Sequence, residues 1–408
     1  MRCRHCGTEL EQMLVDLGTA PPSNAYLDAT QLDESERWYP LRVRVCHGCW
    51  LVQTEDYARR DVLFASDYAY FSAVSESWLH HCERYVEQMV QSLALGPASR
   101  VVEVAANDGY LLQYVARRGI ACLGIEPTAS TAAAARARGL EIREEFFGLA
   151  CAERLVADGW RADLMVANNV LAHVPDPNDF LRGFAHALAP TGVVTFEFPH
   201  LVHLIEKSQF DTIYHEHYSY LSFTTACTLM EHNGLAVHDV ESLASHGGSL
   251  RVHAQRADCG SRPRGAAVDA LLMHERALGV TTPRYYAGFQ QRAERIKHDF
   301  LGFLLDARRQ GRSVAAYGAA AKGNTLLNFA GVRPDLLPWV VDRNSAKQGR
   351  FLPGSRIPVV GEAQLWRDEP QDIVILPWNL RDEIVAQLAD ARRWGARFAV
   401  ALPRLEVF

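Results

Sequence analysis

Short apolar runs alternate with amphipathic stretches through the middle of the chain, and this alternation predicts strands and helices in turn. A helical pattern at 78–95 precedes the apolar run RVVEVAA (100–106), the polar turn NDG, the stretch YLLQYVARRG and a second apolar run, ACLGIEP (121–127). Further segments of the same predicted sheet follow at 143–148, 162–176 and 188–200. Strands that alternate with helices in this way predict an α/β domain with a largely parallel sheet.

The C-terminal part of the chain repeats this alternation after a helical region. Within the helical pattern of 261–311, the stretch TTPRYYAGFQQRAERIKHDFLGFLLDARRQG predicts one long amphipathic helix. A strand, a glycine-rich turn and a helix follow in SVAAYGAAAKGNTLLNFAG (313–331). Further strands are predicted within 336–360, 372–388 and 398–403. The chain therefore shows two βαβ patterns with no recognisable sequence repeat, which predicts two Rossmann-like α/β domains.

Composition and charge favour an ordinary globular protein. The chain has 408 residues, of which 48% are apolar and 22% charged, which is enough for two or three domains. Its net charge of −6 provides no basic field for nucleic acid or an anionic membrane. There is no apolar run of about 18 residues and no signal-peptide pattern. We therefore expect a cytoplasmic protein that acts on small molecules, without nucleic-acid or membrane partners.

Four of the nine cysteines form two CxxC pairs near the N-terminus, Cys3 with Cys6 and Cys46 with Cys49. Tetrahedral zinc is bound by four thiolates delivered in such pairs, and a site with four protein ligands has no open position for catalysis. A redox CxxC or chance pairing would also place cysteines at this spacing. A second pair makes structural Zn²⁺ the favoured prediction, and the other five cysteines are expected to lie in the core.

The first βαβ unit has the order of an adenosine-binding unit but lacks the GxGxxG that cradles a pyrophosphate. Its turn runs from Glu103 to Gly109 with a single glycine, and Glu126 ends the second strand, where an acid binds ribose hydroxyls. This looks like the first motif of class I methyltransferases, whose ligand is S-adenosylmethionine (SAM). The candidate cofactor-binding residues are Glu103, Ala105, Asn107, Gly109, Tyr110, Leu111, Glu126, Pro127, Phe146, Phe147, Asn168 and Asn169.

The segment DTIYHEHYSYLS (211–222) is dense in histidine, tyrosine and acid. It does not match the helical zinc signature HExxH, because His215 and His217 are two residues apart and position 219 is Ser. In an extended strand, Glu216 and His217 would face opposite sides of the sheet. If both serve one pocket, the backbone must turn here, and a turn or helix start is the prediction.

The ordered set of a four-cysteine module, a methyltransferase core, YHEHYSYLS, SHGGSLR and a second unit with YGAAAKGN resembles the SAM-dependent sugar C-methyltransferases. These are three-domain enzymes that methylate C3 of nucleotide-linked 4-keto-deoxysugars. The resemblance implies a zinc-binding module (1–65), a SAM-dependent methyltransferase domain (66–255) and a nucleotide-sugar-binding domain (256–408). It also implies SAM in the middle domain, a ketosugar, with dTDP as the expected nucleotide, in the cleft between the last two domains, and a histidine base. We expect a monomer.

The implied chemistry requires a base because a sugar C–H bond is acidic only beside a ketone. A base removes the C3 proton, and hydrogen-bond donors hold the charge that develops on the C4 oxygen. The family pattern places the base at His217, with His215 as the competing candidate. The implied catalytic residues are His217, Tyr214, Glu216, His173 and Tyr68.

Basic and polar residues in the glycine-rich turns are candidate ligands for the sugar nucleotide. Lys322 stands beside a glycine-rich turn at a helix start, where diphosphates bind, although it would also suit an exposed helix surface. An ordinary hairpin turn explains SHGGSLR nearly as well as a substrate contact does. The candidate substrate-binding residues are His246, Ser249, Arg251, Tyr317, Lys322, Asn324, Asp342, Arg343, Lys347 and Arg350.

Three other functions fit parts of the pattern. The C-terminal unit could bind NAD(P)H and make the protein a combined methyltransferase and ketoreductase, although GxGxxG and a YxxxK pair are missing. The methyl acceptor could also be an oxygen or nitrogen atom. Lastly, the chain could be a non-catalytic zinc-module adaptor with a degenerate nucleotide fold.

Overall fold

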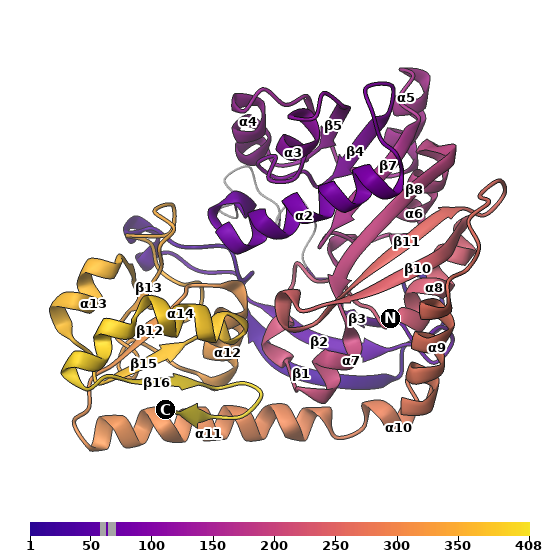
Figure 1. The fold of residues 1–408 in the computed structure, drawn as a ribbon. Coiled ribbons are helices and arrows are strands. Elements are labelled where there is room, and N and C mark those ends of the chain that lie inside the picture. The colour runs from indigo at the N-terminus through magenta and orange to yellow at the C-terminus, as the bar shows by residue number, and fades with distance from the viewer. Residues whose placement is uncertain (58–62, 64–70) are drawn as a thin grey trace.

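The structure is a computed structural model, and it describes residues 1–57, 63 and 71–408. Its strands form three sheets that lie around a common centre (Figure 1). The N-terminal sheet is antiparallel and has the order β1-β2-β3-β9. Its strands are β1 (Gln12–Ala20), β2 (Tyr39–Val45), β3 (Val52–Thr54) and β9 (Ser219–Tyr220). The last strand comes from the histidine-rich segment, which is therefore built into the edge of the N-terminal sheet.

The central sheet has seven strands in the order β10-β11-β8-β7-β4-β5-β6. Strands β8, β7, β4, β5 and β6 are parallel, and β11 runs antiparallel between β8 and β10. The strands are β4 (Arg100–Val104), β5 (Ala121–Ile125), β6 (Ile142–Arg143), β7 (Ala162–Asn168), β8 (Leu188–Pro199), β10 (Leu235–Leu243) and β11 (Ser249–Arg256). The predicted parallel α/β domain is confirmed. Of the 143–148 region, only Arg143 lies in a strand, together with Ile142 in β6.

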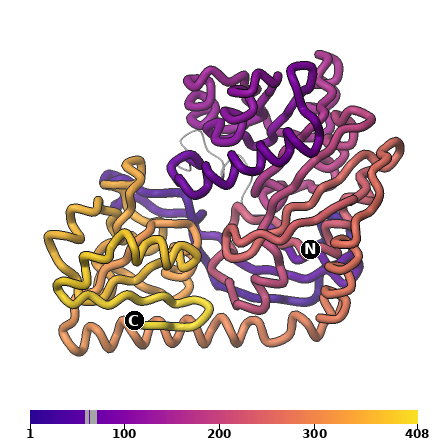
Figure 2. Tube along the Cα trace, in the orientation of Figure 1, coloured from indigo at the N-terminus to yellow at the C-terminus, as the bar shows by residue number. Residues whose placement is uncertain are grey.

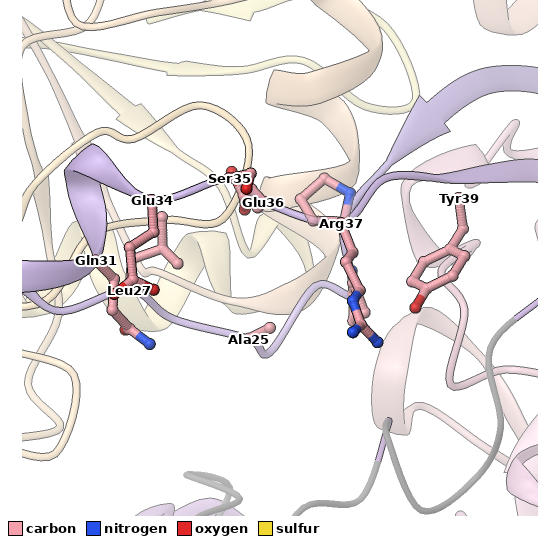
Figure 3. Close-up of a pocket in the computed structure, with 10 residues that line it drawn as sticks. Ala25, Leu27, Gln31, Glu34, Ser35, Glu36, Arg37 and Tyr39 are labelled. Atoms are coloured by element: carbon pink, nitrogen blue, oxygen red, sulfur yellow. The ribbon is translucent and has the colours of Figure 1, made fainter.

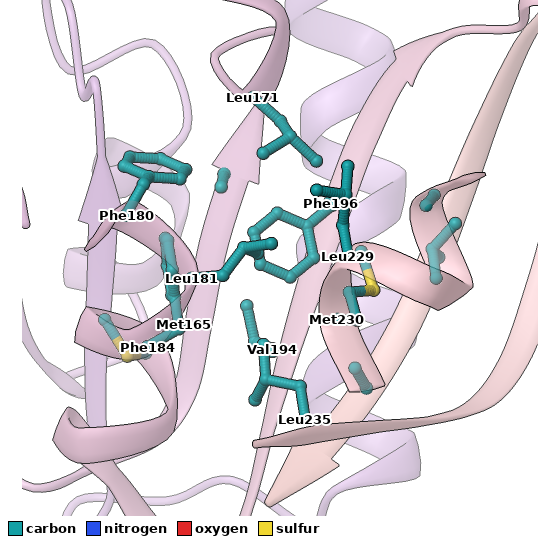
Figure 4. Close-up of a cluster of buried hydrophobic side chains, with 14 of the residues drawn as sticks. Met165, Leu171, Phe180, Leu181, Phe184, Val194, Phe196, Leu229, Met230 and Leu235 are labelled. Carbon is teal, nitrogen blue, oxygen red and sulfur yellow. The ribbon is translucent and has the colours of Figure 1, made fainter. Parts of the chain in front are cut away.

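Helices cover both faces of the central sheet and bury its apolar side chains. The helices are α2 (Glu76–Ser92), α3 (Leu112–Ala116), α4 (Ala129–Ala137), α5 (Leu149–Ala157), α6 (Pro177–Ala187), α8 (Phe223–His232) and α9 (Ala266–Leu278). Helix α7 (Leu201–Glu206) instead packs into the apolar cluster of the N-terminal sheet and α11. On one face, Phe184 of α6 packs edge-on against Phe196 of β8 with ring centroids 4.9 Å apart (Figure 4). Leu229 and Met230 of α8 close the same cluster. Each such buried side chain contributes about 1.5–3 kcal/mol to folding.

The C-terminal sheet has the order β14-β13-β12-β15-β16-β17, and all its pairs are parallel except β16 with β17. Its strands are β12 (Val314–Tyr317), β13 (Val340–Val341), β14 (Val359–Val360), β15 (Asp372–Ile375), β16 (Arg397–Val400) and β17 (Glu406–Val407). Its helices are α12 (Ala321–Ala330), α13 (Glu362–Asp368) and α14 (Arg381–Gln387). The second predicted Rossmann-like unit is therefore present.

The single long helix predicted over 281–311 is wrong. The chain forms α10 (Pro283–Tyr286) and α11 (Phe289–Arg309), which are separated at Gly288. Gly288 has φ +77°, a left-handed conformation that glycine adopts without steric cost and that ends a right-handed helix. Helix α11 then runs along the base of the C-terminal sheet (Figure 1).

The N-terminal region packs against both larger parts of the molecule. Cys3, Cys46 and Leu51 belong to the same apolar cluster as the central sheet and α8. Leu14 and Val15 of β1 belong to a second cluster that includes residues of α11 and α12. The trace in Figure 2 shows this N-terminal chain between the other two parts. The N-terminal sheet is therefore a bridge, and its edge strand carries the histidine-rich segment to the centre.

Candidate active site

The segment from Tyr214 to His217 forms a tight turn just before β9. The amide of His217 donates to the carbonyl of Tyr214 over 2.9 Å, and two residues later the chain pairs with β3. From the C-terminal unit, the hydroxyl of Thr325 in α12 donates to the carbonyl of Ile213 over 2.9 Å. The predicted turn is therefore present, although Glu216 and His217 make separate side-chain contacts.

The ring of His217 is oriented by a backbone carbonyl. Its Nδ1 donates to the carbonyl of Thr212 over 2.8 Å, and because a carbonyl can only accept, Nε2 keeps the lone pair. The ring centroid lies 3.9 Å from that of Tyr214 and 4.6 Å from that of His173. Burial first, and then the charge of His173, holds the pKa of His217 well below its usual range. The imidazole is therefore neutral and presents Nε2 as a proton acceptor.

The ring of His173 is also oriented by a backbone carbonyl. It ends the short 3-10 helix Leu171–His173 after β7, and its Nδ1 donates to the carbonyl of Glu216 over 2.9 Å. Burial lowers the pKa of His173 to about 4. Two neutral imidazoles, each with its Nδ1 proton committed to a carbonyl, therefore lie edge to face.

The Glu216 side chain faces away from this pair of rings. Its carboxylate is fully buried and accepts from the side-chain amide of Asn24 over 3.1 Å, and burial raises the pKa of Glu216 to about 7. Among the described residues it makes no hydrogen bond to His217, whose ring is oriented by the Thr212 carbonyl. Asn24 and Thr212 were not predicted, because neither a loop asparagine nor a backbone carbonyl has a distinguishing sequence pattern.

His215, the competing base, faces the N-terminal sheet. Its Nε2 donates to the carbonyl of Pro40 over 3.3 Å, and its ring centroid lies 5.9 Å from that of Tyr39. The turn thus sends the two histidines to different parts of the molecule. The other predicted catalytic residue, Tyr68, lies outside the described residues.

The predicted cofactor turn has a strongly bent backbone. Ala105, Asn107 and Gly109 have φ values of +59°, +48° and +79°, and a Cβ at Gly109 would lie 2.2 Å from a methyl carbon of Leu140. Runs of such residues turn backbone amides inward and form concavities for polar groups. Glu126 closes the turn by accepting from the amide of Asn107 over 2.9 Å.

The charges around this turn fit a cationic ligand. Burial raises the pKa of Glu103 well above its usual range, and the neighbouring carboxylates of Asp108 and Glu126 raise it further. A sulfonium or ammonium group placed among these acids would offset their repulsion. Both side-chain amide atoms of Asn168 at the end of β7 are buried without a partner among the described residues. These groups fit SAM, with its sulfonium and amino charges.

Other predicted cofactor residues divide between the turn and the apolar core. Tyr110 and Leu111 are buried beside Gly109, while Pro127 follows Glu126 and Asn169 follows Asn168 along the chain. The ring of Phe147 packs against Phe184 with centroids 4.7 Å apart, inside the apolar cluster of the central sheet. Phe146 is 37% exposed. The core packing of Phe147 accounts for its position without a ligand.

In the turn between β10 and β11, His246 lies near His217. It has φ +54°, its ring centroid lies 5.4 Å from that of Trp78, and its charge is one of the causes that lower the pKa of His217. Burial lowers the pKa of His246 to about 4. His246 is thus a third neutral imidazole on this side of the molecule.

Two further residues of the same turn are already bound within the protein. The Ser249 hydroxyl donates to the carbonyl of Ser245 over 2.9 Å. Arg251 is 3% exposed, and its guanidinium donates to the buried carboxylate of Glu197 over 2.8 Å. A substrate contact by Arg251 would require this internal ion pair to break, so its predicted substrate role stays a prediction.

Just after the turn that follows β12, Lys322 lies near His217. Lys322 donates to the side-chain oxygen of Asn379 over 2.6 Å, and its Nζ lies 4.9 Å from the ring centroid of Trp378. Burial lowers the pKa of Lys322, while the charge of Asp211 acts in the opposite direction. Lys322 is also among the charges that lower the pKa of His217. The placement of Trp378 and Asp211 was not predicted.

The acid that ends β13 organises the backbone of this second turn. Asp342 accepts from the amide of Ala319 over 2.9 Å and from that of Asn344 over 2.8 Å. Lys347 lies 3.5 Å from the same carboxylate and donates to the Ala319 carbonyl over 2.9 Å. Of the other candidates, the hydroxyl of Tyr317 donates to the carboxylate of Glu362 over 2.5 Å. The buried side-chain amide of Asn324 has no partner among the described residues. Arg343 and Arg350 flank this region in sequence.

The four predicted zinc ligands lie together. The Sγ atoms of Cys3 and Cys49 are 3.6 Å apart, those of Cys6 and Cys46 are 3.5 Å apart, and all four lie within 4.8 Å of one another. Tetrahedral zinc with bonds of about 2.3 Å places its sulfur atoms about 3.8 Å apart, so the set fits Zn²⁺. Gln53 donates to the sulfur of Cys3 over 3.2 Å. The cluster has four thiol ligands, which is the composition of a structural site.

A separate pocket of about 230 Å³ lies along the loop between β1 and β2 (Figure 3). The side chains of Arg37 and Tyr39 lie at one end of it. The same loop carries Asn24, which binds Glu216, and pairs with the C-terminal unit through backbone bonds between Leu27 and Phe351. The pocket is lined by Pro21, Pro22, Ala25, Leu27, Gln31, Glu34, Ser35, Glu36, Arg37 and Tyr39.

Family models match three successive parts of the chain. Residues 3–64 match the model described as "Putative zinc binding domain", residues 78–240 match "Methyltransferase domain", and residues 244–403 match "C-methyltransferase C-terminal domain". No helix in the described part of the chain is long and apolar enough to cross a membrane.

Relatives match the chain over very different lengths. The C-methyltransferase NovU of Streptomyces niveus is 33% identical over 405 residues, which cover 99% of this chain and 96% of NovU. A ubiquinone biosynthesis O-methyltransferase of Bordetella avium is 28% identical over 138 residues, 31% of this chain and 57% of its own. Among solved structures, magnesium protoporphyrin IX methyltransferase of Synechocystis PCC 6803 is 14% identical with a TM-score of 0.33, covering 44% of this chain and 82% of that one.

Proposed function

The chain belongs to the SAM-dependent C-methyltransferases, and we propose that its methyl acceptor is C3 of a nucleotide-linked 4-keto-deoxysugar, with dTDP as the nucleotide. The observation that carries this proposal is the tautomer of His217, whose Nδ1 proton is committed to the Thr212 carbonyl. Carbon methylation requires a base, because a carbon acceptor has no lone pair until a proton has been removed, and a neutral imidazole with Nε2 unprotonated can take that proton.

In the proposed reaction, Nε2 of His217 takes the C3 proton and the electron pair of that bond delocalises onto the C4 carbonyl oxygen. The neighbouring Tyr214 is the proposed donor to the developing oxyanion, since its ring lies 3.9 Å from that of His217. SAM supplies the electrophilic methyl group when it is bound. Neutral His173 borders the same space, and its ring helps to exclude water from the carbanion.

The proposed binding mode uses the opposite charges of the two α/β units. The acidic turn around Glu126 would hold SAM, and the basic turn that contains Lys322 and Lys347 would hold the diphosphate. The division into 1–65, 66–255 and 256–408 belongs to the same proposal, with the sugar between the last two parts. We further propose that the protein works as a monomer, because these groups all come from one chain.

The test is proton exchange at C3. The protein is incubated with SAM and a dTDP-4-keto-6-deoxysugar in deuterated water, and the product is analysed by NMR and mass spectrometry. We expect loss of the C3 proton signal and a new carbon-bound methyl group. If no 4-ketosugar yields methylated product or S-adenosylhomocysteine, the proposed acceptor is wrong.

A matched pair of histidine variants identifies the base. His217→Asn should lower C3 exchange by at least about 100-fold while SAM still binds, because general bases contribute about 10²–10⁴-fold. His215→Asn is the control, since its ring faces Pro40 rather than the pair of imidazoles. Exchange that survives in His217→Asn and disappears in His215→Asn would reverse the assignment.

A further inference from the structure

A residue inside the first cysteine knuckle reaches toward the two imidazoles. Arg4, between Cys3 and Cys6, has a side chain that is only 5% exposed. Its guanidinium donates to the carbonyl of Thr54 over 2.8 Å and to that of Pro175 over 3.2 Å. The guanidinium also pairs with the carboxylate of Asp56 over 3.2 Å, and these contacts together hold the buried arginine, and with it the knuckle, in one place.

The two carbonyls that Arg4 binds belong to segments beside the proposed active site. Pro175 follows His173 by two residues. Thr54 ends β3, and its hydroxyl donates to the carbonyl of His217 over 3.0 Å. The amide of Thr54 also donates to the carbonyl of Tyr218 over 3.1 Å. One guanidinium therefore spans the loop that carries His173 and the strand that is bonded to His217.

The backbone of the knuckle is connected to the same strand. The amide of Arg4 donates to the side-chain oxygen of Gln53 over 3.0 Å, and the side-chain nitrogen of Gln53 donates to the Cys3 sulfur over 3.2 Å. Gln53 is fully buried. The guanidinium also lies 5.1 Å from the ring centroid of Tyr218. The position of the knuckle, which four thiolates around zinc would hold, thus determines where Arg4 and β3 lie.

We propose that Arg4 and Thr54 are positioning residues that fix the separation of His217 and His173 through the zinc-binding knuckles. Their link is continuous from Cys3 through Gln53 and Arg4 to Thr54 and the His217 carbonyl. This inference rests on the proposed function only for the part these histidines play in the reaction. The mechanical link itself is independent of the substrate.

Hydrogen exchange of backbone amides tests the link without any substrate. In the native chain, the His217 amide is bonded to the Tyr214 carbonyl, and the Tyr218 amide is bonded to the Ala172 carbonyl over 2.7 Å. In Arg4→Gln with its zinc retained, peptides covering 171–176 and 214–220 should exchange at least about 10-fold faster than in the native protein. Arg2→Gln, in an exposed residue of the same module, is the control and should not change them.

Thr54→Val provides a second, nearly isosteric variant that removes only the hydroxyl bonded to His217. It should speed exchange in 214–220 more than in 171–176, and zinc content measured by metal analysis should stay unchanged. If Arg4→Gln loses its zinc, Thr54→Val alone decides between the outcomes. Unchanged exchange of 214–220 in a zinc-loaded variant of either residue would overturn the proposal.

Kinetics then connect the link to catalysis. Displaced supporting residues typically cost about 10–100-fold in activity, so Arg4→Gln should lower kcat by about 10-fold while KM changes by less than about twofold. A purely local role in the zinc module would leave both exchange and kcat unchanged. If exchange rises but no methyl transfer to any ketosugar occurs even in the native protein, the link stands and the proposed acceptor fails.

Discussion

In both Rossmann-like units, an acid at the end of the second strand accepts from two backbone amides, but the charged side chains around that acid are of opposite sign. In the central unit, Glu126 accepts from the amides of Asn107 and Thr128, each over 2.9 Å. In the C-terminal unit, Asp342 accepts from the amides of Ala319 and Asn344 in the same relation to its strand. Each acid thus ties the end of the second strand to the turn after the first.

The two units differ in the charged side chains near this acid. Glu126 is in a group of carboxylates with Glu103 and Asp108, which favours a cation. Asp342 has Lys347 within 3.5 Å, and Lys322 lies at the start of α12 after the same turn. The shared arrangement does not itself specify a ligand. In our proposal, the neighbouring charges favour the sulfonium of SAM in the central unit and a diphosphate in the C-terminal unit.

The largest effect should come from removing the Glu126 carboxylate in the central unit. Glu126→Gln replaces an acceptor of two backbone bonds with a group that carries N–H donors, and a lost bond to a charged group is worth about 1.5–3 kcal/mol. We expect the SAM dissociation constant, measured by calorimetry, to rise by about 10–100-fold. Asp342→Asn is the matched variant and should leave SAM binding within about twofold of native. Equal weakening in both variants would remove the distinction between the units.

A smaller effect should follow from removing the cation of the C-terminal unit. Lys322→Met keeps most of the side chain's volume but deletes the charge, so the KM for the sugar nucleotide should rise by about 10-fold while SAM affinity is unchanged. Steady-state kinetics at constant ionic strength measure the first quantity and calorimetry the second. Lys297→Met is the control, because that lysine lies over Phe329 on the α11 side. A KM that does not respond to Lys322→Met would place the diphosphate elsewhere.

The smallest effect tests whether the charge of Lys322 in the C-terminal unit acts on His217, the proposed base. The pKa of His217 lies well below its ordinary 6.5, so the neutral base persists and the acid limb of kcat/KM should fall below pH 6.5. The charge of Lys322 makes protonation of His217 harder, and its removal should raise that pKa and move the acid limb to higher pH by less than about 1 unit. The pH profiles of native protein and Lys322→Met measure this shift. A shift toward lower pH would contradict the assigned sign.

Several features of the site followed from local patterns. The paired spacing of Cys3, Cys6, Cys46 and Cys49 predicted a cluster that the structure assembles. The turn predicted at 214–217 is also present, but the reason given for it was wrong, because Glu216 and His217 do not share a hydrogen-bond partner. By contrast, the helix predicted over 281–311 is interrupted at Gly288. A single glycine costs a helix only about 1 kcal/mol, so whether a helix is interrupted there depends on the packing around it.

The sequence by itself therefore determined the two α/β units, the acid at the end of each second strand and the thiol cluster, since each depends on residues close in the chain or on a spacing specific to its chemistry. Only the tertiary structure decided that the Thr212 carbonyl orients His217 and that Asn24 holds Glu216. The same is true of the contact from Arg4 to Pro175. The physical reason is that every residue has a carbonyl and every arginine has the same donors, so a contact between residues far apart in the chain exists only once folding has brought them together.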